Sequence, residues 1–162
     1  MKKKFVYLAC AAAAALTLTA CGGGNSKDAE NDVVEIDVEA LASDLLKTVT
    51  EDSLSQTSSD MLPSIYFYEE DTVEEAIAYT SSGTTSCEIA VVKSKDAANA
   101  SKIEELFQTR VDNQAELYAS YNAPEAERLE NDAIIESAGA YTVLCVCDET
   151  DEAKDVLKKY GF

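Results

Sequence analysis

The spacing of apolar residues along the chain predicts two amphipathic helices, one early in the chain and one near its middle. Between residues 38 and 50, apolar residues recur at intervals of three and four, which places on one helical face Val38, Leu41, Ala42, Leu45, Leu46 and Val49. The same spacing returns after Asp96 and continues for about 25 residues, as expected of the longest helix. Asp37 and Asp96 are suited to begin these helices, because a short carboxylate accepts hydrogen bonds from the first backbone N–H groups.

Two pairs of β-prone segments predict two antiparallel hairpins. The first pair is EAIAYTSS and CEIAVVKS, residues 75–82 and 87–94, joined around Gly83. The second pair is AIIESAG and AYTVLCVCD, residues 133–139 and 140–148, which meet at Gly139. The last of these segments is apolar on both faces, with one face formed by Tyr141, Val143, Cys145 and Cys147 and the other by Leu144 and Val146. It is therefore predicted as a central strand that helices cover on at least one side.

The order of these elements predicts an α+β fold with one antiparallel sheet of about four strands. The sheet packs against the long central helix and against helices at the N- and C-terminal ends. A short helix, PEAERLEN, begins at Pro124, and a last helix covers residues 150–160. Residues 36–162 are enough for a single domain with one core.

The first 35 residues have a different organisation. Three lysines, Lys2 to Lys4, precede an apolar run over residues 5–20, a pattern typical of a secretory signal. LTAC, residues 18–21, resembles the bacterial lipobox, which implies cleavage after Ala20 and a diacylglycerol on Cys21. Residues 1–20 are thus predicted as a lipoprotein signal peptide, and residues 21–35 as the lipidated cysteine and a flexible acidic tether. The alternative is an uncleaved signal anchor with an incidental cysteine.

Charge narrows the range of partners. Removal of residues 1–20 takes away three lysines and no acids, so 10 basic and 31 acidic side chains remain, a net charge of −21. Such a surface repels phosphate backbones, which excludes a nucleic acid as partner. It also repels anionic lipid headgroups, so we expect the lipid on Cys21 to be the contact with the cell membrane, on its extracytoplasmic face.

The nucleophilic and titratable residues of the chain do not form a recognisable catalytic motif. The chain has no histidine, which excludes nucleophilic catalysis of the Ser–His or Cys–His type within one chain. Cys145 and Cys147 are two apart in a predicted strand and are unsuited to bridge each other, whereas a bridge from Cys87 to either stays open. The favoured interpretation of all three is as small apolar core residues. We predict no catalytic residue, no metal and no cofactor, and a hydrolase based on paired carboxylates remains an alternative.

One segment stands out as a candidate surface for interactions. LPSIYFYEEDTVEE, residues 62–75, contains a proline that argues against one continuous element, and IYFY within it is predicted as a short strand or a turn. Exposed aromatics beside carboxylates suit a sugar, a cationic peptide or a partner protein, and the candidate residues are Tyr66, Tyr68, Glu69, Glu70 and Asp71. The competing and favoured interpretation is that Ile65 and Phe67 are buried against the sheet edge.

The chain from about residue 37 onward resembles a family of bacterial lipoproteins, the domain-of-unknown-function family 4358. The resemblance depends on ALASDLL, SSGTTSCEIAVVKSKDA and SYNAPEAERLENDAIIESAGAYTVLCVCDE, in which marked positions include Gly83, Glu88 and Pro124. It implies an anchored extracytoplasmic domain with no assigned activity and no established catalytic residues. We therefore expect a non-catalytic binding or envelope-accessory module, with a ligand-binding lipoprotein for a cation or cationic peptide as the alternative.

Overall fold

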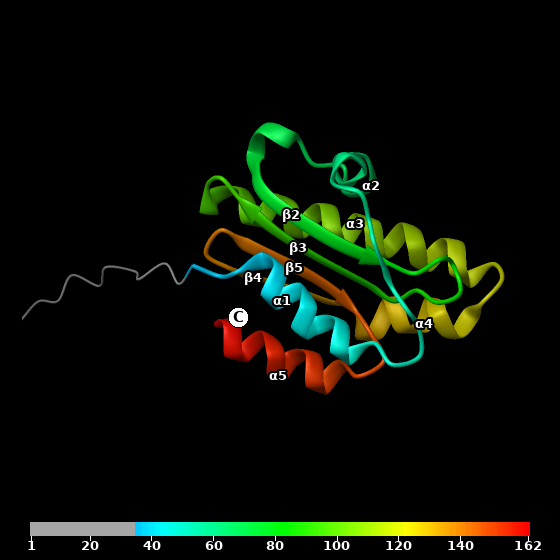
Figure 1. Ribbon diagram of the computed structural model, residues 1–162. Helices are drawn as coiled ribbons and strands as arrows, with labels where there is room; N and C mark the ends of the chain where they lie inside the picture. Colours follow the sequence, from blue (N-terminus) through cyan, green and yellow to red (C-terminus); the bar gives the residue numbers. More distant parts are fainter. Residues whose placement is uncertain (1–34) are drawn as a thin grey trace, which may run out of the picture. The chain divides into compact units, whose positions relative to one another are not determined.

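A five-stranded antiparallel sheet forms the middle of the molecule (Figure 1), in the order β1-β2-β3-β5-β4. The computed structural model describes residues 35–162. The predicted signal peptide, Cys21 and nearly all of the predicted tether lie outside the described residues. The strands are β1 (Ser55–Gln56), β2 (Val73–Thr80), β3 (Glu88–Ser94), β4 (Ile134–Ala138) and β5 (Tyr141–Val146).

The two predicted hairpins are confirmed, and they share the sheet through β3 and β5. β2 pairs with β3, β4 pairs with β5, and the β3–β5 pairing places Glu88 opposite Val146. The corner of the second hairpin is at Gly139, whose φ of 60° is readily adopted by a residue without a Cβ. The fifth strand, β1, is absent from the prediction because two residues are too few to show an alternating pattern.

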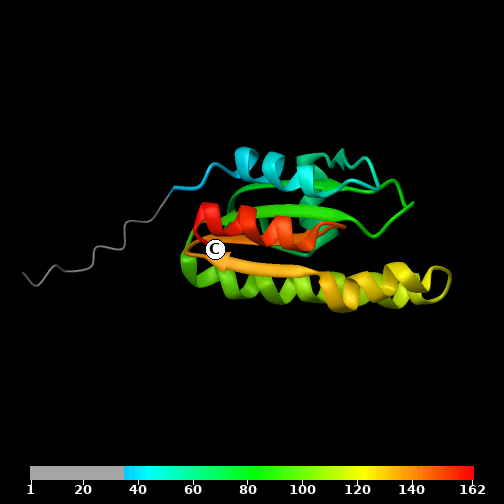
Figure 2. The same ribbon diagram turned by 90° about the horizontal axis from the view of Figure 1, so that it is seen from below.

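Helices cover both faces of the sheet, as Figure 2 shows. On one face lie α1 (Val38–Leu45) and α5 (Thr150–Tyr160), and on the other lie α3 (Ala100–Ala119) and α4 (Ala123–Asp132). The short helix α2 (Leu62–Tyr66) packs into the same core cluster as α3. No helix among residues 35–162 is long and apolar enough to cross a membrane.

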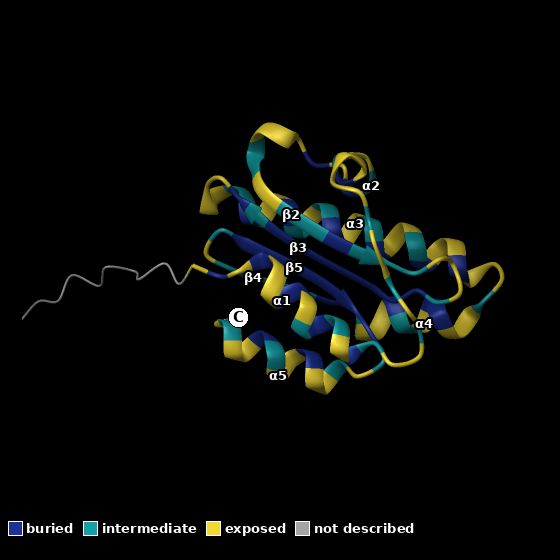
Figure 3. Cartoon of the chain, viewed as in Figure 1, coloured by how far each residue is buried: buried dark blue, intermediate teal, exposed yellow. Residues whose placement is uncertain are grey.

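The sheet separates two hydrophobic clusters, and β5 contributes to both. Tyr141, Val143 and Cys145 pack under α1 and α5, whereas Leu144 and Val146 pack against α3. All six residues of β5 are buried, so the prediction of a strand with two apolar faces is confirmed. Figure 3 shows the resulting dark-blue stripe of buried residues along β3 and β5, with exposed positions on the outer sides of the helices.

The predicted helix starts are confirmed for the two long amphipathic segments. The Asp37 side chain accepts a hydrogen bond from the backbone N–H of Ala40 at 2.9 Å. Asp96 accepts one from Ala98, also at 2.9 Å, and this bond begins a short 3-10 turn that leads into α3. Pro124 lies in the first turn of α4, where its missing N–H costs no helical hydrogen bond.

For the segment around IYFY the sequence predicts a short strand or a turn, and the structure instead places its first two residues at the end of the helix α2 (Leu62–Tyr66). Pro63 lies in its first turn, and the helix ends at Phe67, whose φ is 59°. Leu62 and Tyr66, one helical turn apart, face the core, and this geometry directs the next residue outward. Of the two residues expected to be buried, Ile65 is half-buried against the core, whereas Phe67 is 61% exposed, so the expectation is wrong for Phe67.

Candidate functional site

The predicted surface candidates Tyr66 and Tyr68 lie inside the protein, which corrects the expectation of exposed tyrosines. Tyr66 is 1% exposed and Tyr68 is 8% exposed. Both face inward because α2 turns the chain, while the neighbouring Phe67 takes the outward position. Glu69, Glu70 and Asp71 follow directly and are exposed.

Tyr66 is held by a buried ion pair between the sheet and α3. Its hydroxyl donates a hydrogen bond to Glu88 Oε1 at 2.6 Å. Arg110 donates two further bonds to Glu88, from Nε at 2.6 Å and from Nη2 at 2.8 Å. The Arg110 guanidinium lies 5.3 Å from the centre of the Tyr66 ring, and burial raises the pKa of Tyr66 well above its ordinary value. This network fixes α2 to β3 and α3.

Two grooves lie on either side of Tyr68, and we name them after one residue in each. The Phe67 groove, of about 260 Å³, lies between the end of α2 and the start of α3, and its lining includes Phe67, Tyr68, Glu69, Lys102, Ile103 and Leu106. The Glu75 groove, of about 320 Å³, lies along the start of β2, and its lining includes Asp60, Pro63, Tyr68, Glu70, Glu74 and Glu75. The first groove is mainly apolar and the second is strongly acidic.

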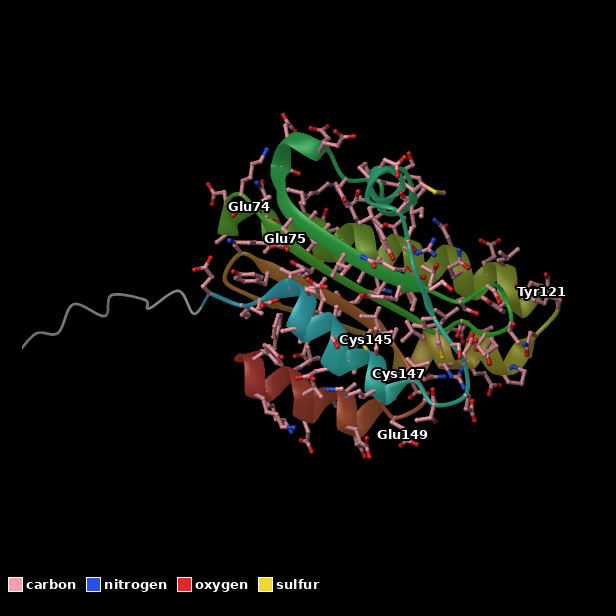
Figure 4. All side chains as sticks on the ribbon, viewed as in Figure 1. Glu74, Glu75, Tyr121, Cys145, Cys147 and Glu149 are labelled. Atoms are coloured by element: carbon pink, nitrogen blue, oxygen red, sulfur yellow. The ribbon has the colours of Figure 1, made fainter. Side chains whose placement is uncertain are left out.

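The acids of the Glu75 groove differ in whether they have a partner. Glu74 forms an ion pair with Lys93 at 2.9 Å. Glu70 and Glu75 have no basic group within 4 Å in the part of the chain that the structure describes. Figure 4 shows Glu74 and Glu75 beside β2, at the end of the molecule away from Tyr121. Asp60 also has no ion pair in the described residues and accepts a hydrogen bond from Ser58 Oγ, so three carboxylates of this groove have their charge available to a ligand.

A second polar region surrounds the loop from Ser81 to Cys87, at the end of the first hairpin. Asp52 accepts hydrogen bonds from Ser81 Oγ and Thr85 Oγ1, each at 2.6 Å. These bonds hold the pKa of the Asp52 carboxyl below its ordinary value, since they stabilise the ionised form. Ser81 Oγ in turn accepts bonds from the backbone N–H groups of Gly83, Thr84 and Thr85. The loop is thus held together by its own hydroxyl groups and one carboxylate.

A buried carboxylate from α4 closes this loop from the other side. Glu125 Oε2 accepts hydrogen bonds from the backbone N–H of Ser86 at 2.7 Å and from its Oγ at 2.8 Å. Arg128 Nη1 lies 3.0 Å from the same oxygen, and its Nη2 lies 2.9 Å from Glu51. Each of these carboxylates faces a donor of the protein itself, which leaves little capacity for an external substrate.

The three described cysteines are free and buried, in agreement with their prediction as core residues. Cys145 and Cys147 lie beneath α1 (Figure 4) and belong to the cluster under α1 and α5. Burial raises the pKa of the Cys87 thiol, although Thr85 and Arg128 partly oppose this change. Neither a disulfide nor a group of three metal-ligating side chains occurs among residues 35–162.

Phe67 is an exposed apolar residue of this surface, and the sequence did not identify it. Its sequence signal is weak, because a single aromatic residue between two buried tyrosines does not show which way it points. Only the helical turn of α2, with its left-handed end, distinguishes Phe67 from its neighbours. Met61, at the other end of α2, is 53% exposed, so both ends of this helix present a large apolar side chain.

Comparison with known proteins gives one match. A domain of unknown function, DUF4358, matches residues 47–147, which is more than half of the chain. The chain belongs to this family. The DUF4358 match includes all five strands, both grooves and the Ser81–Cys87 loop, and leaves out the whole of α1 and of α5. No curated protein and no solved structure matches the chain.

Proposed function

We propose that this DUF4358 protein is a lipid-anchored, extracytoplasmic accessory protein that binds a partner through the surface around α2 and catalyses no reaction. The location is supported by the lysines, the apolar run and the lipobox-like LTAC before Cys21. A diacylglycerol carries two acyl chains, which is enough for stable anchoring. The partner surface consists of the Phe67 groove, the Glu75 groove and the exposed ends of α2.

The observation that carries the binding role is the conformation and exposure of Phe67. A left-handed backbone costs a residue with a Cβ about 1–2 kcal/mol, and glycine is the common residue at this position after a helix. Phe67 adopts that backbone and still leaves 61% of its surface in solvent. Folding alone gives no advantage to a large apolar side chain there. A partner that covers the ring provides one.

The absence of catalysis is supported by the engagement of the buried acids. A carboxylate hydrolase requires two carboxyl groups that face one cleft and can exchange protons with a substrate. Glu88 is held by Tyr66 and Arg110, and Glu125 is held by Ser86 and Arg128. Donors from several elements hold both carboxylates in place and occupy their oxygens. This arrangement suits a structural role better than acid–base chemistry.

The anchor is tested by metabolic labelling of cells with an alkyne analogue of palmitate. We expect the wild-type chain to be labelled and recovered with the membrane fraction. We expect Cys21→Ala to lose the label and to keep its leading segment. An unlabelled wild-type product, together with equal membrane association of Cys21→Ala, would overturn the anchoring part of the proposal.

The binding surface is tested in intact cells by a photo-crosslinking residue at position 67. Leu117 is the matched control, because it is also apolar and 53% exposed but lies 11 residues further along α3 than the last residue of the Phe67 groove. We expect one discrete adduct from position 67 and none of that size from position 117. The same adducts from both positions would contradict a partner site at α2.

A further inference from the structure

We infer that the surface around α2 binds a basic peptide segment, with an apolar side chain in the Phe67 groove and lysine or arginine side chains in the Glu75 groove. This inference rests on the proposed binding role of the surface and adds the chemistry of its partner. It depends on two neighbouring grooves of unlike character that share Tyr68 as a common wall.

The apolar part of the ligand follows from the walls of the Phe67 groove. Phe67, Ile103 and Leu106 supply apolar surface, and at about 260 Å³ the groove is large enough for one side chain of leucine or phenylalanine size. Burial of such a side chain contributes about 1.5–3 kcal/mol. A free metal ion or a small cation gains nothing from this groove. The ligand therefore includes an apolar group.

The basic part follows from the charge of the second groove. Asp60, Glu70, Glu74 and Glu75 line it, and in the described residues only Glu74 among them forms an ion pair with a base of the chain. Like charges that line one groove repel one another in the free protein, and a cationic ligand relieves that repulsion. An acidic partner is excluded by the same charge.

A peptide fits this combination better than a single ion. Coordination of a divalent ion needs several oxygens that converge on one point, and no such group of acids occurs among residues 35–162. Glu74 and Glu75 lie at the start of β2 (Figure 4), whereas Asp60 and Glu70 come from the short turns before it. Carboxylates from three separate segments suit several separate cationic groups. A peptide carries these groups and an apolar side chain on one backbone.

The test uses the full-length lipidated chain in phosphatidylcholine vesicles, which carry no net charge and do not attract a basic peptide. Three capped, fluorescein-labelled pentapeptides serve as probes: Lys-Lys-Leu-Lys-Lys, Lys-Lys-Ser-Lys-Lys and Glu-Glu-Leu-Glu-Glu. Fluorescence anisotropy at low ionic strength gives their affinities. We expect the leucine peptide with lysines to bind about tenfold more tightly than the serine peptide, because one buried apolar side chain is lost. We expect the acidic peptide not to bind.

Charge is tested by matched pairs of substitutions. Glu70→Gln with Glu75→Gln removes two charges from the groove and is expected to weaken the lysine–leucine peptide about tenfold. Glu127→Gln with Glu130→Gln removes the same two charges from exposed positions on α4 and is expected to change affinity less than twofold. Equal effects of the two pairs would overturn the inference, because binding would then depend on net charge alone.

The place of binding is tested by fluorescence, since the chain contains no tryptophan. Phe67→Trp is expected to shift its emission to the blue when the lysine–leucine peptide binds, whereas Leu117→Trp is expected to show no change. A peptide that binds the wild-type chain without changing the Phe67→Trp emission would place it elsewhere and overturn the inference.

The inference and the proposed function can fail separately. If position 67 gives its discrete adduct in cells while none of the three peptides binds, the partner surface stands and its basic-peptide chemistry is wrong. If serine and leucine peptides bind equally, the Phe67 groove has no part in recognition and the two-groove inference is wrong. If neither a peptide nor an adduct is found, the proposed function itself is wrong.

Discussion

The acids around the Ser81–Cys87 loop and the acids around α2 have the same chemistry but opposite surroundings. Near the loop, Glu125 and Asp52 accept hydrogen bonds from Ser81, Thr85 and Ser86. Around α2, Glu70 and Glu75 face solvent without a basic neighbour in the described part of the chain. The acids of the first group connect elements that are distant in sequence through hydrogen bonds, and Glu70 and Glu75 form no ion pair in the described residues.

This difference separates two uses of a carboxylate in a very acidic protein. An acid that accepts hydrogen bonds from several donors stabilises the fold, and its loss leaves those donors without a partner. An exposed acid without a partner adds repulsion to a chain that already has a net charge of −18. Substitution of an acid of the first kind should therefore lower the free energy of unfolding, and substitution of an acid of the second kind should raise it.

The largest effect is expected at the buried ion pair of Glu88. Glu88→Ala removes the acceptor of Tyr66 and leaves the Arg110 guanidinium without its carboxylate partner. Loss of one partner of a buried pair costs about 3–5 kcal/mol. Urea unfolding followed by circular dichroism measures this loss. Glu116→Ala, an exposed position on α3, is the control, and equal midpoints for the two variants would show that the network adds no stability.

The next effect concerns Asp52 and the pH. Because its hydrogen bonds lower the pKa in the folded state below the ordinary value of 3.8, ionised Asp52 stabilises the fold above that pH. This stabilisation is lost as the pH falls through the lowered pKa. Because Asp52 is half-exposed and water can replace part of these bonds, we expect Asp52→Asn to cost about 1 kcal/mol at pH 7. The cost should be smaller in acid, where the wild-type carboxyl is protonated and therefore uncharged like the amide.

Urea unfolding at a series of pH values from neutral to acid measures this difference. Glu127→Gln, on the exposed side of α4, serves as the control that changes charge alone. A stability difference between wild type and Asp52→Asn that stays constant down to the lowest pH would contradict the role given to the Ser81 and Thr85 hydrogen bonds.

The length and the apolar face of an element decide whether it could be predicted from the sequence. Regular alternation and helical spacing predict β2 to β5, α1 and α3, because each of these elements presents a long apolar face to the core. α2 has five residues and no such face to reveal its period. Glu88 pairs with Arg110, 22 positions away, and Glu125 accepts hydrogen bonds from Ser86, 39 positions away. The fold sets these distances, so no local sequence pattern predicts them.

The candidate surface shows the same limit at the level of single residues. The sequence identified the acidic segment after IYFY, but it assigned exposure to Tyr66 and Tyr68 and burial to Phe67. In the structure these three assignments are reversed. In an extended strand Phe67 would lie on the face opposite to Tyr66 and Tyr68, whereas in the helix α2 the buried face consists of Leu62 and Tyr66, four positions apart. Five residues are too few to distinguish the strand period from the helix period.

A smaller effect, with an unusual sign, is expected at the end of α2. Glycine is normally about 1 kcal/mol less favourable than alanine in a helix, but at a left-handed position it is the more favourable residue. We expect Phe67→Gly to be about 1 kcal/mol more stable than Phe67→Ala. At Ser64, within the right-handed part of α2, the order should be the usual one, with Ser64→Ala above Ser64→Gly. The same order at both positions would contradict the left-handed backbone at Phe67.

The smallest effect is expected from the open acids, and its sign decides whether the comparison holds. Glu70→Gln with Glu75→Gln removes repulsion among neighbouring carboxylates and breaks no ion pair in the described residues, so the free energy of unfolding should rise by a few tenths of a kcal/mol at low ionic strength. Added salt screens the repulsion and should abolish the gain. Urea unfolding at low and high salt measures both. A loss of stability instead would mean that these acids support the fold, and would remove the distinction from Glu88 and Asp52.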